Sequence, residues 1–338
     1  MQIKKQNNLL PGILCALWAL LLAFVGAFWL LGPDRYATGS VLLFLPAWLW
    51  ALPGVLVLPV CLWYGPVRIR LCAICLSILA LGPISGFRLG LPIGPGKDYG
   101  QSIRVMTYNV KYNRGGMGAI LRNIKTANPD ILFLQDAGGA ILGPIGEMLK
   151  GYDARGYDQY AIFSRYPLSE LEAVPIPLPF RINECCIKCK LTFKGRKITL
   201  YNVHLITPRE GINAVRADGV DGLDYIEDNA LARLQQTQAL QSSISKEITP
   251  VLLAGDLNSP PASLVNRMLR GCGLRDAFES AGRGWGFTYG HSHRPGLPGI
   301  RIDHIYASPA LKFIRCETGS SKGSEHCPVS SQLIMDNG

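Results

Sequence analysis

Charged residues are scarce in this chain. They make up 17% of its 338 residues, and 48% are hydrophobic, whereas an ordinary soluble domain carries about 25% charge. A disordered chain would show the opposite balance, with few apolar residues and a high net charge. The deficit is largest in residues 1–100, which hold seven Lys/Arg and only two Asp/Glu. This composition excludes both a disordered chain and a wholly soluble one.

Long basic runs are also missing. The net charge is +10, but no run of five or more Lys/Arg occurs anywhere, and such runs are typical of nucleic-acid-binding segments. Half of this net positive charge, +5, lies in residues 1–100 beside the apolar runs. The basic balance therefore does not indicate a nucleic-acid partner, although it leaves one possible.

A second CxxC motif is absent from residues 102–338. Cys185, Cys186 and Cys189 form one cluster with no CxxC after it, and a structural zinc site usually takes four ligands from two such pairs. The alternation over residues 185–193 places Cys185 and Cys189 on the same strand face as Ile187. Cysteines packed in the core are therefore favoured over a metal site. Disulfide bonds remain an alternative whose pairing the sequence does not decide.

Long apolar runs are what the sequence has in abundance. They cover residues 9–31, 41–64 and 71–87. A bilayer core about 30 Å thick needs about 20 helical residues, whereas the apolar region of a signal peptide spans about 7–15. We therefore expect residues 1–87 to be an anchor with about three transmembrane helices, the second kinked by its prolines.

Basic residues around these runs predict the orientation. Lys4 and Lys5 precede the first run, and Arg68 and Arg70 separate the second from the third. Lys and Arg are enriched in cytoplasmic loops. The N-terminus is therefore expected in the cytoplasm, and three crossings would then place the domain after the spans outside it. The predicted protein is integral to the plasma or inner membrane, and its partner is the lipid bilayer.

The remaining chain follows a different pattern. Residues 88–101 are rich in Gly and Pro and are expected to be a linker. Residues 102–338 alternate short β-like runs with helices, which favours an α/β sandwich whose two sheets share a core. Strands are predicted at residues 103–108, 131–135, 160–164, 185–193, 197–205, 250–254, 301–307 and 327–334, and helices at 117–127, 228–246 and 261–269.

Residues 206–227 have no place in this pattern. A loop of this length is usually functional or disordered, so it is expected either to wall a substrate cleft or to be a floppy insertion. Its ionisable side chains are mostly acidic. An acidic rim would repel a polyanion, which weakens the case for nucleic acid as the substrate.

Polar side chains gather at the ends of the predicted strands. Taken singly, an Asn or Asp there is most often a turn former or a helix cap. Together, acids, amides and two histidines suit phosphoester hydrolysis, because Mg²⁺ prefers carboxylate oxygens and the transition state needs its phosphoryl charge neutralised. The clusters are Asn109, Gln135-Asp136, Asn202-Val-His204, Asp256-Leu-Asn258, Arg301-Ile-Asp303 and Ser324-Glu325-His326.

In their order and in their residues, these six motifs resemble those of the endonuclease/exonuclease/phosphatase superfamily, and the resemblance covers residues 103–335. The resemblance implies a four-layered α/β/β/α sandwich of the deoxyribonuclease I type. It also implies a divalent cation, Mg²⁺ or Mn²⁺, and a phosphorylated substrate. The implied fold agrees with the strand-rich pattern of the outer domain.

The resemblance also assigns roles to the motif residues. The metal would be held by Asn109, Asp136, Asp256 and Glu325. Phosphate would be bound by Asn109, Asn202, His204, Asn258 and His326. Catalysis would be carried by His204, Asp256, Asn258, Asp303 and His326, with Asp303 orienting His326. Arg301 would fix the strands and the walls of the site.

Two acids depart from the family pattern. Asp136 stands where the family has Glu, and Glu325 stands where it has Asp. The leading hypothesis is a membrane-anchored, metal-dependent phosphoesterase that cuts a phosphodiester or phosphomonoester outside the cytoplasm, with a membrane-proximal or lipid-linked substrate favoured. The alternatives are a nuclease cleaving DNA or RNA, and a catalytically silent module that binds a phosphorylated ligand.

Overall fold

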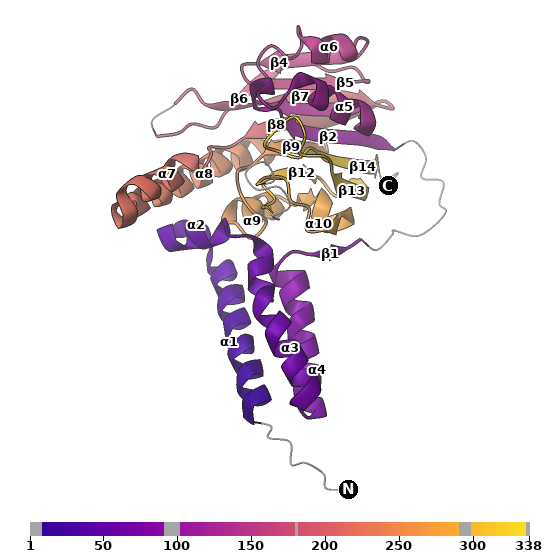
Figure 1. The fold of residues 1–338 in the computed structure, drawn as a ribbon. Helices are drawn as coiled ribbons and strands as arrows, with labels where there is room; N and C mark the ends of the chain where they lie inside the picture. The colour runs from indigo at the N-terminus through magenta and orange to yellow at the C-terminus, as the bar shows by residue number, and fades with distance from the viewer. Residues whose placement is uncertain (1–8, 91–101, 180–181, 291–298, 336–338) are drawn as a thin grey trace.

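The computed structural model describes residues 9–90, 102–179, 182–290 and 299–335. A bundle of apolar helices lies at one end of the molecule and an α/β body at the other (Figure 1). The expected linker at 88–101 is described only as far as residue 90, where the short strand β1 (Arg88–Leu89) pairs with β11 (Arg283–Gly284).

Three helical segments of the bundle are long and apolar enough to cross a membrane, by length and composition: Leu9–Leu31, Ala47–Tyr64 and Val67–Ile84. The first is α1 (Leu9–Leu31). The second joins a 3₁₀ turn (Ala47–Ala51) to α3 (Leu52–Tyr64), and the third joins α4 (Val67–Leu79) to a π turn (Ala80–Ile84).

The second apolar run was expected to be one kinked span over residues 41–64, but no single helix begins at residue 41. A separate short helix, α2 (Ala37–Leu43), ends just before Pro46, because a residue that precedes proline disfavours the helical conformation. The third helix begins at Val67 rather than at residue 71. The break leaves α2 free to turn away from the bundle axis (Figure 1).

The body consists of two six-stranded sheets with helices outside them. One sheet has the order β10-β12-β9-β8-β7-β6 and the other β13-β14-β2-β3-β5-β4. The strands of the first are β6 (Glu172–Pro175), β7 (Cys185–Phe193), β8 (Arg196–His204), β9 (Val251–Asp256), β10 (Arg275–Asp276) and β12 (Asp303–Ala307). Those of the second are β2 (Ile103–Asn109), β3 (Ile131–Gln135), β4 (Asp153–Tyr157), β5 (Tyr160–Ser164), β13 (Leu311–Thr318) and β14 (Val329–Met335).

Apolar side chains fill three spaces between layers. Phe133 and Leu200 belong to the core between the two sheets. The outer face of the first sheet packs on α8 (Leu223–Ile244) and α9 (Leu264–Gly271), and that of the second on α5 (Met117–Ala127) and α6 (Pro144–Met148). These layers confirm the predicted α/β/β/α sandwich.

Strand β7 spans the predicted residues and alternates as expected. Ile187 and Cys189 lie in the core between the sheets, and Cys186 packs on the opposite face of the strand. All ten cysteines are free thiols in the structure. The Cys185–Cys189 cluster therefore belongs to the packing of the strand.

Residues 206–227 are helical rather than a loop. They form α7 (Arg209–Asp218), a 3₁₀ turn (Gly219–Gly222) and the first turn of α8. Gly211 allows α7 to approach α8 closely, since a Cβ there would lie 2.8 Å from the Cα of Ile226. The expectation of an irregular segment was wrong because this close helix packing cannot be read from local sequence.

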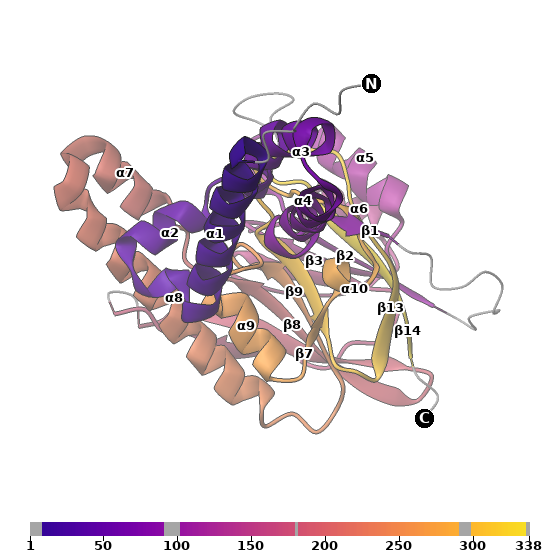
Figure 2. The same ribbon diagram turned by 90° about the horizontal axis from the view of Figure 1, so that it is seen from below.

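The segment after α1 docks on the body. The backbone N–H of Leu264 at the start of α9 donates to Oδ2 of the buried Asp34 at 3.0 Å. The Arg267 guanidinium donates to the carbonyl oxygens of Leu30, at 2.7 Å, and Trp29. As Figure 2 shows, α2 lies beside α8 below the body. The helical bundle is thus attached to the body by specific contacts as well as by the chain.

A buried charged cluster fixes α10 (Ala277–Ala281) against β12. Asp276 caps this helix and accepts hydrogen bonds from Arg301 and His304, each at 2.8 Å. Burial alone would raise the pKa of Asp276, but the Arg301 guanidinium, with His304, holds it far below its usual value. Arg301 therefore has the structural position that the family resemblance implies.

Strand register at the end of β9 depends on Gly255. Its φ is +154°, and a Cβ would lie 1.8 Å from the carbonyl oxygen of Val203 on β8. We expect Gly255→Ala to destabilise the full-length protein by about 3 kcal/mol or more, because β8 and β9 must separate. The measurement is thermal unfolding in detergent. Gly118→Ala on α5, with its nearest neighbour at 3.6 Å, should be neutral or stabilising, and equal losses in both variants would contradict the prediction.

Asp276→Asn should lower the free energy of unfolding by about 3–5 kcal/mol, because it leaves the buried Arg301 guanidinium without its carboxylate partner. An unfolded Asp titrates near pH 3.9, and the folded pKa of Asp276 lies below that value. Its stabilisation is therefore complete above about pH 4 and is lost as the pH falls further. The difference in melting temperature between wild type and Asp276→Asn should be constant from about pH 6 to about pH 4 and should narrow as the pH falls towards 3. Asp218→Asn, which changes an exposed acid, should melt at the same temperature as wild type throughout. A gap that is independent of pH would disprove this assignment.

Candidate active site

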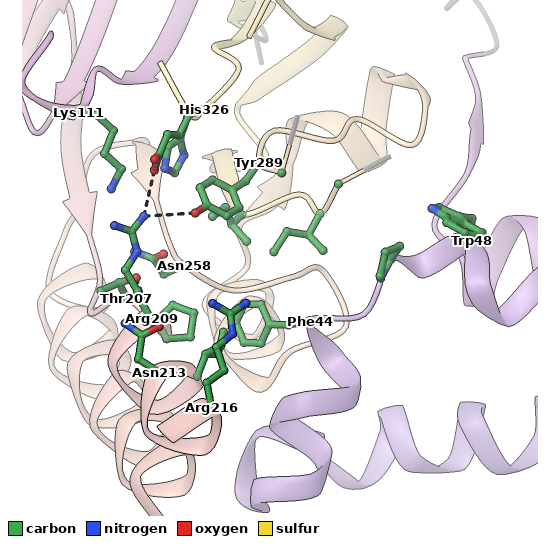
Figure 3. A pocket seen from close by; sticks show the side chains of 18 residues that line it. Phe44, Trp48, Lys111, Thr207, Arg209, Asn213, Arg216, Asn258, Tyr289 and His326 are labelled. Atoms are coloured by element: carbon green, nitrogen blue, oxygen red, sulfur yellow. Dashed lines mark hydrogen bonds and ion pairs between the residues drawn. The ribbon is translucent and has the colours of Figure 1, made fainter. Parts of the chain in front are cut away.

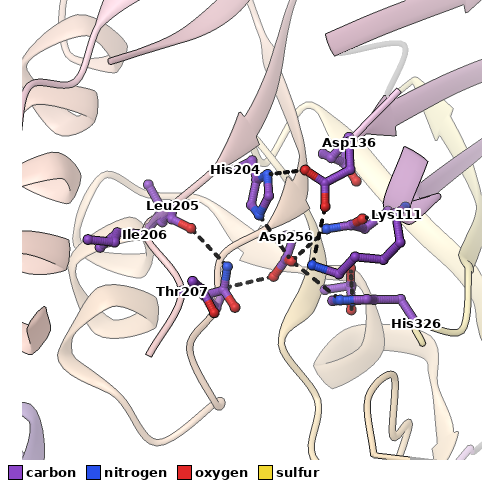
Figure 4. A network of polar contacts seen from close by, with 12 residues as sticks. Lys111, Asp136, His204, Leu205, Ile206, Thr207, Asp256 and His326 are labelled. Atoms are coloured by element: carbon purple, nitrogen blue, oxygen red, sulfur yellow. Dashed lines mark hydrogen bonds and ion pairs between the residues drawn. The ribbon is translucent and has the colours of Figure 1, made fainter. Parts of the chain in front are cut away.

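Strand register brings three of the predicted residues into one row. On the first sheet His204, at the end of β8, is paired with Asp256 at the end of β9. Asp256 is in turn paired with Asp303 at the start of β12. Asn109 ends β2 in the facing sheet. Both sheets thus present polar side chains at the same end of the sandwich (Figure 4).

Asp256 lies at the centre of this group and is fully buried. Its Oδ2 accepts a hydrogen bond from Nδ2 of Asn109 at 3.0 Å, and its Oδ1 accepts one from the backbone N–H of Asn258 at 2.9 Å. Nε2 of His204 and Nε2 of His326 lie 3.5 and 3.7 Å from Oδ2. Burial opposes ionisation, but these imidazoles and the nearby Lys111 hold the pKa of Asp256 below its usual value.

Asp303 orients the second imidazole. Nδ1 of His326 donates to its carboxylate at 2.9 Å, which directs Nε2 towards Asp256. Burial would lower the pKa of His326, but the two carboxylates raise it above its usual value. Burial raises the pKa of Asp303 itself. The geometry thus forms a buried Asp–His–Asp arrangement, in which Asp303 is placed to orient His326 as the resemblance implies.

His204 lies between two carboxylates on the other side. Its Nδ1 donates to Oε1 of Gln159 at 2.7 Å and lies 3.7 Å from Oδ1 of Asp136, while Nε2 faces Asp256. Asp136 follows β3 and adopts a left-handed φ of +49°, a conformation that Asp and Asn tolerate best. That turn brings the Asp136 carboxylate to the same end of the sandwich as Asp256.

Lys111 is a member of the site that the sequence motifs did not reveal. Its Nζ lies 3.2 Å from Oδ2 of Asp136. Burial would lower the pKa of Lys111, but Asp256 and Asp136 raise it above its usual value. Its position two residues after Asn109 was the available signal. The backbone turn (φ +47°) that brings it inwards is not evident from the sequence.

Two acids and a histidine could hold a cation. Among the described residues, Asp256, Asp303 and His326 offer ligand atoms that all lie within 4.8 Å of one another. Two buried carboxylates with the Asn109 amide beside them suit a hard cation such as Mg²⁺. The chemistry of this donor set fits a divalent cation, but the set shares only Asp256 with the expected metal ligands, because Asp303 and His326 were expected to act in catalysis. The expected metal roles of Asn109 and Asp136 stay predictions.

Two of the predicted residues lie elsewhere. Asn202 is buried between the sheets and donates to the carbonyl oxygens of Leu134 and Ala161, while its Oδ1 accepts from Gln135. Both of its donors are used, so Asn202 links the sheets and was wrongly expected to bind phosphate. The longer side chain of Glu325 reaches outwards and accepts a hydrogen bond from Arg209 at 3.0 Å, so it lies apart from the buried acids that could hold metal.

Asn258 lies at the boundary between this buried network and the solvent. Its φ is +48°, and Nδ2 donates to the carbonyl oxygen of Leu205 at 2.8 Å. The residue fixes the end of β8 and also lines the adjoining cleft. Its expected role in phosphate binding stays a prediction.

The buried network opens into a cleft of about 520 Å³ (Figure 3). His326 and Asn258 form its inner end, and the α7 residues Arg209 and Arg216 line one side. The helical bundle contributes to this wall as well. The cleft is lined in this part by Phe44, Pro46 and Trp48 from the α2–α3 connection.

The net acidic composition of residues 206–227 was therefore misleading. Arg209 and Arg216 are seven residues apart on α7 and share a face, and both line the cleft. Arg209 also donates to the hydroxyl of Tyr289 at 3.3 Å. Of the acids in this segment, Glu227 accepts from the backbone N–H of Ala37 instead. The cleft is thus basic although the segment beside it is acidic overall.

Solved structures support this fold. A family protein from Bacteroides thetaiotaomicron is 19% identical (TM-score 0.54; 70% of this chain and 99% of that one covered). The mannosyl-6-phosphatase Bt3783 of the same organism is also 19% identical (TM-score 0.53; 69% and 100%). D. rerio TDP2 complexed with single-strand DNA product is 17% identical (TM-score 0.52; 70% and 100%).

The search of curated proteins gave no match. The sequence model of the endonuclease/exonuclease/phosphatase family, in contrast, matches residues 106–326. This range includes every polar cluster at the strand ends, from Asn109 to His326. It covers well over half of the chain, and the chain therefore belongs to the endonuclease/exonuclease/phosphatase family.

Proposed function

We propose that this protein is a membrane-anchored, divalent-metal-dependent phosphoesterase that hydrolyses a phosphodiester or phosphomonoester of a membrane-proximal or lipid-linked substrate. The observation that carries the proposal is the composition of the cleft. Its inner end is formed by Asn258 and His326, with the buried Asp256 carboxylate 3.7 Å behind Nε2 of His326, and its outer wall includes Phe44 and Trp48 from the α2–α3 connection. A substrate bound there would touch both parts of the chain.

The residues at the inner end suit attack on a phosphate by water. Asp256 is kept ionised in a buried setting and can orient a water and accept its proton. His326, held by Asp303, and His204 can donate hydrogen bonds to phosphoryl oxygens as charge develops on them. Asp256, Asp303 and Asn109, with Asp136 beside them, would hold Mg²⁺ or Mn²⁺, which supplies charge neutralisation and an acidified water.

Basic side chains continue along the cleft. Lys111 lies next to the carboxylates, and Arg209 and Arg216 lie farther out. A substrate phosphate would compete with Asp136 for Lys111 and with Glu325 for Arg209, and charge-assisted bonds to phosphate are among the stronger hydrogen bonds. The gradient from the buried acids to the arginines favours a substrate whose phosphate enters from the α7 side.

Membrane anchoring and orientation belong to the same proposal. The three long apolar segments meet the length and composition needed for spanning. Arg68 and Arg70 lie at the start of α4, and the turn between α3 and α4 lies at the end of the bundle away from the body (Figure 1). By the enrichment of Lys and Arg on the cytoplasmic side, the body would lie outside the cytoplasm.

A nuclease is the second candidate, and the similarity to a TDP2 bound to single-strand DNA product favours it. A strand of nucleic acid carries regular charge and calls for an open basic track. Here the cleft is closed on one side by Phe44, Pro46 and Trp48, which favours the lipid-linked substrate. A silent phospho-ligand module is the third candidate.

Metal removal should abolish hydrolysis. With full-length protein in detergent, we expect cleavage of p-nitrophenyl phosphate or bis-p-nitrophenyl phosphate to stop in EDTA and to return with Mg²⁺ or Mn²⁺. Asp256→Asn should lower kcat by roughly 10²- to 10⁴-fold, because it removes the general base. Asp218→Asn is the control. Hydrolysis that resists both EDTA and Asp256→Asn would overturn the proposal, and metal-independent binding without hydrolysis would support the silent module.

Lys111 should contribute to binding of the phosphate. We expect Lys111→Gln to lower kcat/KM by roughly 10- to 100-fold, the loss of about 1.5–3 kcal/mol from one charged hydrogen bond. Steady-state kinetics on the same esters measure it, and Lys125→Gln, an exposed lysine on α5, is the control. Equal kinetics of Lys111→Gln and wild type would show that the ammonium only balances Asp136.

A further inference from the structure

The geometry points to a binding site for the hydrocarbon chain of the substrate in a groove between α2 and the α7–α8 pair. This inference rests on the proposed function and narrows it. The substrate class would be a phosphate ester of a long-chain lipid. The groove is defined by Val41, Leu45, Val215, Ile226 and Ala230, together with the residues that it shares with the cleft.

The first observation is continuity. The groove has a volume of about 340 Å³ and shares Phe44, Pro208, Ile212 and Arg216 with the cleft that ends at His326. Ligand sites usually measure about 300–1,000 Å³, so each space is large enough to hold part of a ligand. A molecule whose phosphate lies beside His326 can therefore extend past Ile212 into the groove.

The second observation is the division of polarity. At the catalytic end the lining includes Lys111 and Arg209. Arg216 lines both spaces, and the groove beyond Ile212 is lined mainly by aliphatic side chains. An anionic head with an apolar tail matches this order. A sugar phosphate or a nucleotide would leave the apolar part without a partner, and apolar surface is stabilised by burial at about 25 cal/mol per Å².

Arg233, the second charged residue of the groove beside Arg216, has its own partners. Arg233 is buried, and its guanidinium donates to the carbonyl oxygen of Ile206 at 3.0 Å and to Asn229. Its guanidinium also lies 5.9 Å from the ring centre of Phe44. Burial lowers its pKa to about 10, so it stays charged at neutral pH. Arg233 thereby holds Phe44 at the junction of cleft and groove.

The third observation is the place of α2 in the molecule. This helix follows α1, the first long apolar segment, after a 3₁₀ turn (Pro33–Arg35), and it lies next to α7 and α8 (Figures 1 and 2). Apolar side chains of the same segment are exposed, among them Tyr36, Val41 and Leu45. A lipid chain leaving the bilayer beside α1 would meet the groove before the cleft.

Chain-length selectivity tests the site. The test compares kcat/KM of the full-length protein in detergent for two substrates whose alkyl chains have four or sixteen carbons. The substrates are alkyl phosphates or the matching alkyl p-nitrophenyl diesters. Wild type should prefer the sixteen-carbon ester by about tenfold or more in kcat/KM, because even two buried methylenes are worth about that factor. Val215→Trp narrows the groove outside the cleft and should remove this preference. Its kcat/KM for the four-carbon ester should stay within about twofold of the wild-type value.

Val220→Trp is the matched control. Val220 is 78% exposed and lies nearby on the turn between α7 and α8, so this variant should keep the wild-type preference. The proposal is overturned if wild type shows no chain-length preference. Equal behaviour of Val215→Trp and Val220→Trp would overturn it as well.

A second measurement does not depend on hydrolysis or on the folding of a variant. A sixteen-carbon alkyl phosphate with a diazirine near the chain end is photolysed with the wild-type protein, and the labelled peptides are identified by mass spectrometry. Labels on α2, α7 and α8 at the groove support the site, and labels confined to the long apolar helices refute it. Groove labelling without hydrolysis would contradict the proposed enzyme but not the chain site.

Discussion

The buried carboxylate of Asp256 is the constraint on which the rest of the site depends. A buried, unpaired charge costs several kcal/mol. Here the cost is offset by Asn109, the backbone of Asn258, and the imidazoles of His204 and His326. These groups come from different strand ends in both sheets. The charge is therefore tolerated only while the two sheets keep their register, which makes the architecture and the chemistry interdependent.

The helical bundle is part of this architecture. Asp34 accepts the first backbone N–H of α9, and Phe44 stacks below Arg233 of α8. The segment between α1 and α3 consequently lies against the body and supplies one wall of the cleft. A tether alone would bring the site near a membrane, whereas this docking also sets what the cleft can accept.

The eight strands predicted from the local sequence agree with the structure to within two residues, because alternating burial and turn residues are local signals. Strands β4, β6, β10 and β13 of the two sheets were not predicted. It predicted the cluster of Asp256, Asp303 and His326 through the motif order. It did not predict the helical state of residues 206–227, since α7 depends on packing against α8. Nor did it reveal Lys111, which reaches the carboxylates through a left-handed turn, or the outward pairing of Glu325 with Arg209.

The sequence by itself determined the apolar helices, the two-sheet sandwich and the chemical type of the site, because hydrophobic periodicity and motif residues are fixed by the order of the chain. Only the tertiary structure decided which side chains share the cleft. Asn202 lies between the two sheets. Arg209 and Arg216 line the cleft although their segment is acidic overall, and Phe44, far away in the sequence, lines the same cleft. The physical reason is that such contacts depend on how distant elements pack against one another, which no local pattern encodes.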